Sequence, residues 1–154
     1  MKYLLTYRMF ESRAETELIW IHGLPGSGKS HLIQKIIRES EFEWSVFDDT
    51  AGVEEILASL QAGKRVILAS PYFEDYIPIG LGKRLRSSLA DLDQVTLREV
   101  WFSNDPDQCI ENVLSRKGHD IAARSIVSEI PTFSRNYMIP DGVVTEPVWQ
   151  ARTP

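Results

Sequence analysis

The fold is decided by the stretch Gly23-Leu24-Pro25-Gly26-Ser27-Gly28-Lys29-Ser30, which lies between an apolar run and a helical pattern. It matches the phosphate-binding loop pattern G-x-x-x-x-G-K-[ST]. Glycines let the backbone curl so that successive N–H groups face phosphate oxygens, and the start of the following helix adds partial positive charge. These eight residues therefore predict a site for a nucleoside triphosphate.

Each residue type in this stretch has a part in holding ATP and Mg²⁺. The Lys29 ammonium can reach the β- and γ-phosphates, and the Ser30 hydroxyl can ligate Mg²⁺. His31 follows where threonine is common, and two roles stay open for it, contact with the α-phosphate or packing of the helix. The residues expected at the nucleotide are Gly23, Pro25, Gly26, Ser27, Gly28, Lys29, Ser30 and His31.

Apolar patterns around the loop predict strands that alternate with helices. Strands are expected at 18–22, 44–47, 66–69 and 97–102, with a last one at 143–149. Helices are expected at 29–38, 53–60, 79–92, 125–136 and from Pro106, with Asp105 as the N-cap of that helix. Buried strands alternating with helices are typical of an α/β fold. We expect the three-layer P-loop NTPase arrangement, with a mostly parallel sheet of about five strands.

Length, charge and composition bound the class of protein. The 154 residues suit one domain, 1–154, in which 1–17 form an N-terminal extension. One cysteine excludes a disulfide framework within the chain and is typical of a reducing compartment. A net charge of −5 disfavours a broad nucleic-acid-coating surface. No apolar run approaches the ~18 residues of a membrane span, and the N-terminus lacks a signal-peptide pattern, so a cytoplasmic protein is expected.

A second part of the site is predicted where the strand at 44–47 ends. Asp48 and Asp49 follow this strand directly, and the carboxyl ends of parallel strands face the ligand crevice. A carboxylate there could accept a proton from an attacking hydroxyl or help to hold Mg²⁺. The candidate metal ligands are therefore Ser30, Asp48 and Asp49. The alternative is that one of the two aspartates only caps the next helix.

The phosphate-binding loop followed by Val46-Phe47-Asp48-Asp49 resembles the small P-loop kinases of the polynucleotide kinase and zeta-toxin group. The segment from Trp101 to Arg116 is similar to the same group, and the likeness covers most of residues 18–137. It implies ATP- and Mg²⁺-dependent transfer of a γ-phosphate to a hydroxyl or phosphate acceptor. It also implies that this acceptor is a nucleoside, nucleotide or nucleic-acid end, that the source is a bacterium or phage, and that Asp48 is the catalytic base.

The same resemblance implies a lid over the phosphates, which falls on residues 116–124. Arg116 matches the lid arginine, so the implied catalytic set is Lys29, Asp48 and Arg116. Lys117 takes its place if the register slips by one, and Arg124 could line the same lid. The chain departs from the group at Ser70, where many members have a metal-binding aspartate, and in a connection of 16 residues between Asp49 and Val66 that is short for the group.

Two other functions stay open at this point. A nucleotide-dependent binding or regulatory module that hydrolyses ATP slowly is favoured by Ser70 and by the short connection. A nucleoside monophosphate kinase would need arginines for the phosphate of its acceptor, and Arg84 and Arg86 are the candidates. Cys109, on a predicted helix, is expected to be a packed thiol rather than a nucleophile.

Overall fold

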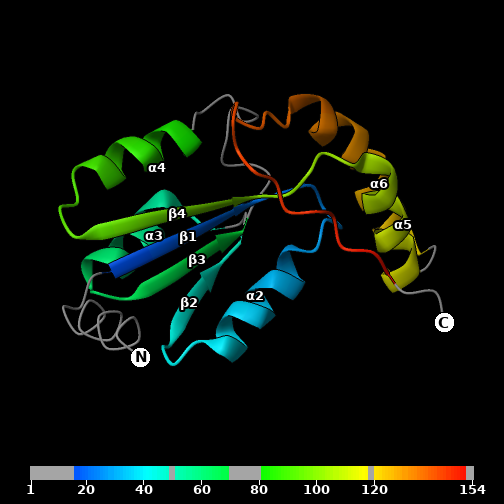
Figure 1. The fold of residues 1–154 in the computed structure, drawn as a ribbon. Coiled ribbons are helices and arrows are strands. Elements are labelled where there is room, and N and C mark those ends of the chain that lie inside the picture. Colours follow the sequence, from blue (N-terminus) through cyan, green and yellow to red (C-terminus); the bar gives the residue numbers. More distant parts are fainter. Residues whose placement is uncertain (1–15, 49–50, 70–80, 118–119, 152–154) are drawn as a thin grey trace.

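The computed structural model describes residues 16–48, 51–69, 81–117 and 120–151, and it confirms the predicted α/β fold (Figure 1). The elements are β1 (Thr16–His22), α2 (Lys29–Glu39), β2 (Trp44–Phe47), α3 (Val53–Gln61), β3 (Arg65–Ala69), α4 (Leu81–Ala90), β4 (Val95–Trp101), α5 (Pro106–Lys117) and α6 (Ile121–Asn136). Helix α4 ends two residues before the predicted residue 92, and its predicted start at residue 79 lies outside the described residues. Of the expected N-terminal extension, 1–17, only the first two residues of β1 are described.

The described strands form one parallel sheet in the order β2-β3-β1-β4. Strand β1 lies inside the sheet, so Ile19 pairs with Ile67 of β3 on one side and with Arg98 of β4 on the other. Every residue of β1 except Glu17 is buried, which explains its continuous apolar run. The carboxyl end of this central strand leads directly into the phosphate-binding loop.

The fifth strand predicted at 143–149 is wrong. In the described residues the sheet has four strands, and this segment makes only an isolated parallel bridge between Phe102 and Glu146. Ser103 N donates to Glu146 O at 2.8 Å, and Glu146 N donates to Trp101 O at 2.8 Å. Beyond Glu146 the segment turns to the phosphate-binding loop, where Trp149 N donates to Ser27 O at 2.9 Å, so the pairing with β4 stops after one bridge.

Helices cover both faces of the sheet. The chain crosses from β1 to β2 in one direction along the sheet and returns to β3 and β4 in the other, so crossovers of one hand place α2 on one face and α3 and α4 on the opposite face. Figure 1 shows α2 and α4 on these two sides. Within the described ranges, no helix combines the length and the apolarity needed to cross a membrane.

Helices α5 and α6 form a hairpin beyond the carboxyl ends of the strands (Figure 1). Asp105 is the predicted cap of α5, and its Oδ1 accepts from Gln108 N at 3.2 Å. Asp120 caps α6 in the same way, accepting from Ala123 N at 2.7 Å, so α6 begins at Ile121 rather than at the predicted residue 125. The hairpin has its own core, which includes Leu24 of the phosphate-binding loop and therefore ties the loop to the hairpin.

Truncating one buried strand residue tests this packing. Leu68 of β3 is fully buried between β1 and β2, so we expect Leu68→Ala to lower the free energy of unfolding by about 2–5 kcal/mol. Leu97→Ala is the matched control, because Leu97 of β4 is 37% exposed and its truncation should change stability by less than about 1 kcal/mol. Urea unfolding followed by circular dichroism measures both, and equal losses would contradict the described core.

Candidate nucleotide-binding site

The phosphate-binding loop connects β1 to α2 through two glycines with positive φ angles. Gly26 has φ +83° and Gly28 has φ +111°, a region that L side chains rarely adopt. Gly28 is also the N-cap residue of α2, and no side chain caps this helix. The first N–H groups of α2 therefore face the loop opening without a capping oxygen, as the binding of phosphate oxygens requires.

Lys29 and Ser27 differ in what they contribute to the loop. The Lys29 ammonium donates to Gly23 O at 2.7 Å and to Leu24 O at 2.9 Å, which holds the positive charge over the loop. The Ser27 hydroxyl is buried, and it has no hydrogen-bond partner among the described residues. A Cβ at Gly23 would lie 2.5 Å from that hydroxyl oxygen, so the Ser27 side chain packs under the loop and only its backbone is available to a phosphate.

The outer side of the loop lies against α5 and the C-terminal segment, residues 145–151. A Cβ added at Gly26 would lie 2.5 Å from the carbonyl oxygen of Cys109, and one added at Gly28 would lie 2.7 Å from Cβ of Trp149. Cys109 is fully buried at this contact, and burial raises the pKa of its thiol to about 12, so it is the packed thiol that was expected. The loop glycines are thus required by packing as well as by backbone conformation.

Asn112 joins the three parts that meet at the loop. Its Nδ2 donates to Gly26 O at 2.9 Å and to Trp149 O at 2.5 Å, and its Oδ1 accepts from Ala151 N at 3.2 Å. The side chain is buried, so these bonds satisfy an amide that would otherwise be desolvated without partners. Sequence reasoning missed this residue, and the available signal was an amide beside Val113 on the apolar face of a predicted helix.

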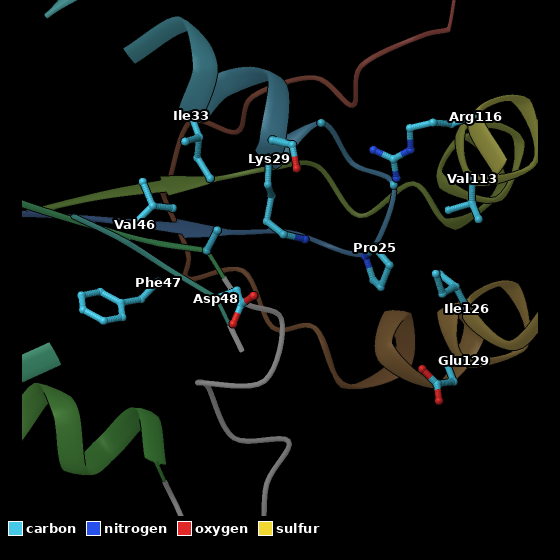
Figure 2. A pocket seen from close by; sticks show the side chains of 14 residues that line it. Pro25, Lys29, Ile33, Val46, Phe47, Asp48, Val113, Arg116, Ile126 and Glu129 are labelled. Atoms are coloured by element: carbon cyan, nitrogen blue, oxygen red, sulfur yellow. The ribbon is translucent and has the colours of Figure 1, made fainter. Parts of the chain in front are cut away.

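A cavity of about 500 Å³ opens beside the loop (Figure 2). It brings together seven of the predicted site residues, Pro25, Gly26, Gly28, Lys29, Ser30, Asp48 and Arg116. Figure 2 shows the Arg116 guanidinium pointing from α5 toward the loop, while Asp48 lies at the end of β2 on the side away from the hairpin. Two cationic groups and a carboxylate from three different elements therefore face the same space.

Among the residues that the structure describes, the remaining predicted site residues do not line this cavity. Gly23 and Ser27 are buried in the loop, Arg124 is exposed in the first turn of α6, and His31 stacks on Trp149. Asp49 and Ser70 lie outside the described residues, as do two residues of the predicted lid, 118 and 119. The described parts of that lid are the last turn of α5 and the beginning of α6.

The suggested acceptor arginines are also elsewhere. The Arg84 guanidinium pairs with Glu54 of α3, and Arg86 pairs with Glu99 of β4 at 2.5 Å. Neither residue lines the cavity. The structure therefore does not bring these two candidate acceptor ligands to the cavity, because both arginines interact with carboxylates on the α4 side of the sheet.

Sequence reasoning missed the part of the cavity that α6 contributes. Glu129 and Ile126 of α6 line it together with Val113 of α5. The wall on the sheet side is mostly apolar and consists of Ile33, Val46, Phe47 and Ala69. The charged lining residues are thus two cations, Lys29 and Arg116, and two carboxylates, Asp48 and Glu129.

The lining of the cavity suits Mg²⁺, because this ion needs only few protein ligands. Among the residues that the structure describes, no cluster of three histidine, cysteine, aspartate or glutamate side chains could hold a metal ion. Mg²⁺ usually takes one or two protein ligands and completes its shell with water and phosphate oxygens. Ser30, Asp48 and Glu129 are all exposed and all line the cavity, so these described residues could supply such ligands, and the first two are the ones that the sequence predicts.

A polar cluster around the buried His22 lies directly before the loop, at the end of β1. His22 Nε2 is 2.9 Å from Glu99 Oε1, and the His22 ring stacks on Trp101 with 3.7 Å between centroids. Burial raises the pKa of Glu99, but hydrogen bonds from His22 and Arg86 and the charge of Arg86 outweigh it and lower the pKa to about 2. The cluster fixes the strand end from which the loop starts.

Comparison with known protein families gives a match for the part of the chain that contains the phosphate-binding loop. Residues 19–76 match the family model of the viral superfamily 1 RNA helicase core domain. This match covers less than half of the chain, from β1 through the loop to β3 and beyond it. No curated protein matches the sequence. The match and the parallel sheet together identify a P-loop NTPase-related domain that binds a nucleoside triphosphate.

Replacing Gly26 tests the contact between the loop and α5. We expect Gly26→Ala to lower the free energy of unfolding by about 2–4 kcal/mol and to abolish nucleotide binding, because the methyl group would add a backbone clash to the strain of a positive φ. Gly142→Ala is the matched control, since Gly142 has φ +78° with nothing within 4 Å of the added Cβ. Gly142→Ala should lower the free energy of unfolding by about 1–2 kcal/mol and leave the affinity for nucleotide unchanged. Similar losses in both variants would contradict the contact.

The lowered pKa of Glu99 predicts a dependence of stability on pH. A depressed carboxyl pKa stabilises the folded state above the ordinary value of 4.5, and this stabilisation disappears as the pH falls from 4.5 to about 2. We expect Glu99→Gln to be less stable than the wild type at pH 6, with a difference that shrinks toward pH 3. Urea titrations at the two pH values measure this difference in the free energy of unfolding. A difference that does not vary with pH would contradict the ionic interactions of Glu99 with His22 and Arg86.

Proposed function

We propose that this domain is a phosphotransferase that moves the γ-phosphoryl group of ATP to a hydroxyl acceptor. The observation that carries the proposal is the shared cavity of Lys29, Asp48 and Arg116. Phosphoryl transfer needs positioned cations around the transferring group and a carboxylate at the attacking hydroxyl. These are the groups that α2, α5 and the end of β2 supply.

The proposed step follows from these positions. The acceptor oxygen attacks the γ-phosphorus as the bond from that phosphorus to the β–γ bridging oxygen breaks, and ADP leaves. The hydroxyl proton passes to the carboxylate of Asp48. Lys29 and Arg116 stabilise the negative charge on the transferring group and on the leaving phosphate. Ser30, with Asp48 or Asp49, would hold Mg²⁺, which would neutralise further charge on the phosphates.

The cavity wall supports a particular kind of acceptor. Apart from the groups assigned to the phosphates, the metal and the base (Lys29, Arg116, Ser30 and Asp48), its described lining is apolar on the sheet side and carries the Glu129 carboxylate on the hairpin side. A carboxylate can accept hydrogen bonds from further hydroxyl groups of a sugar, as in a nucleoside or a nucleic-acid end. We therefore favour a polyhydroxylated acceptor over a phosphate acceptor.

A second function is hydrolysis of the triphosphate, with water in the place of the acceptor hydroxyl. The specific observation in its favour is the match of residues 19–76 to a helicase core domain. In that case the domain couples binding and hydrolysis of the nucleotide to the binding of a partner. Incubation with γ-labelled ATP and a panel of nucleosides, nucleotides and oligonucleotides separates the two functions. A labelled acceptor supports transfer, and release of phosphate alone supports hydrolysis.

Replacing Asp48 tests the assignment of the base. We expect Asp48→Asn to lower the rate of transfer by about 10²–10⁴-fold, because the amide cannot accept the hydroxyl proton. The dissociation constant for ATP, measured by calorimetry, should change less than about threefold. Asp91→Asn is the matched control, since Asp91 is exposed after α4 and does not line the cavity. Transfer at the wild-type rate in Asp48→Asn would exclude Asp48 as the base.

A further inference from the structure

Two aromatic rings stack on each other at the outer edge of the phosphate-binding loop. The His31 and Trp149 rings have centroids 4.1 Å apart and planes inclined by 21°. Trp149 is 38% exposed, and His31 is exposed as well. Neither residue lines the cavity that contains Asp48. Part of the Trp149 indole surface is therefore not covered by packing within the described residues and is accessible to a ligand.

The position of this pair relative to the loop is fixed by the backbone. Trp149 N donates to Ser27 O at 2.9 Å, and Cβ of Trp149 lies next to Gly28. His31 belongs to the first turn of α2, directly after Lys29, expected at the β- and γ-phosphates, and Ser30, expected at Mg²⁺. A triphosphate with its γ-phosphate in the cavity would cross the start of α2, and its nucleoside would leave the loop on the side of His31 and Trp149.

We propose that Trp149, backed by His31, is the stacking platform for the nucleobase of the bound triphosphate. Aromatic side chains stack on bases through their π faces, and the larger ring system of a purine covers more of an indole than a pyrimidine does. The ligand class is therefore a purine nucleoside triphosphate. This inference rests on nucleotide binding by the loop and does not depend on the fate of the γ-phosphate.

The platform can be removed without releasing the segment that carries it. The backbone of Trp149 is held by Ser27 O and by Nδ2 of Asn112, and the buried side chain of Val148 anchors the segment in the core of the hairpin. None of these contacts uses the indole ring. Substitution of Trp149 should therefore remove the stacking surface while the backbone contacts that support the loop stay in place.

The test compares ATP with inorganic tripolyphosphate, which carries the phosphates and no base, by calorimetry in the presence of Mg²⁺. The wild type should bind ATP about tenfold or more tightly than tripolyphosphate, since one base–aromatic stack corresponds to roughly 5- to 150-fold in affinity. Trp149→Ala should weaken ATP binding by a similar factor and leave tripolyphosphate binding unchanged, and Trp149→Phe should keep part of the difference. The control is Val144→Ala, at a residue 93% exposed, which should change neither affinity.

Tryptophan fluorescence gives a second measurement. Trp20 and Trp101 are buried and Trp44 is half-buried, so ATP should alter mainly the emission of Trp149. This change should persist in Val144→Ala and disappear in Trp149→Phe. A structural role for the ring predicts a different pattern, in which Trp149→Ala weakens ATP and tripolyphosphate equally.

Each remaining outcome separates the platform from the proposed transfer. Equal affinity of the wild type for ATP and tripolyphosphate would overturn the platform and leave the transfer reaction intact. Unchanged ATP affinity in Trp149→Ala would overturn it in the same way. Specific loss of ATP affinity in that variant would support the platform even if the acceptor panel detected no transfer.

Discussion

The site depends on the close approach of the loop backbone at Gly26 to helix α5. The space at this contact is too small for one methyl group, because its carbon would lie 2.5 Å from the Cys109 carbonyl oxygen. Asn112 adds a hydrogen bond from the same helix to Gly26 O, and bonds the C-terminal segment through Trp149 O and Ala151 N. Loop, hairpin and C-terminal segment are therefore positioned together, so a shift of α5 would also move Arg116 relative to Lys29.

The arrangement of charge follows from the topology of the sheet. All described strands run in parallel, so their carboxyl ends and the loops after them gather at one edge. This edge brings Asp48 from β2 close to the loop that follows β1. The hairpin lies beyond the same edge and contributes Arg116 and Glu129 from the opposite side of the cavity. Cations from α2 and α5 thus face carboxylates from the end of β2 and from α6, as suits the stabilisation of a transferring phosphoryl group beside a proton acceptor.

The resemblance to small kinases and the match to a helicase core domain cover different lengths of the chain, most of residues 18–137 and residues 19–76. The match ends at residue 76, so it includes the loop and Asp48 but not the hairpin. What the two families share is the nucleotide-binding half of the site. The difference between transfer and hydrolysis therefore depends on what the hairpin wall admits next to the γ-phosphate, a hydroxyl compound or only water.

Local chemistry determined what the sequence could predict by itself. The strand–loop–helix order, the cap at Asp105 and the ends of buried strands depend on neighbouring residues, so the phosphate-binding loop and the placement of Asp48 near it were accessible from the sequence. The placement of Arg116 came from the resemblance to small P-loop kinases. The final strand was not accessible from the sequence, because beyond Glu146 the backbone of this segment bonds the phosphate-binding loop at Ser27 O rather than β4, a contact that the apolar pattern does not indicate. The tertiary structure alone decided that Asn112 bonds Gly26, that Arg84 and Arg86 pair with Glu54 and Glu99, that Glu129 lines the cavity and that Trp149 stacks on His31. The partners in these contacts are between 13 and 118 residues apart along the chain, and such distant pairs leave no periodic signal in a sequence.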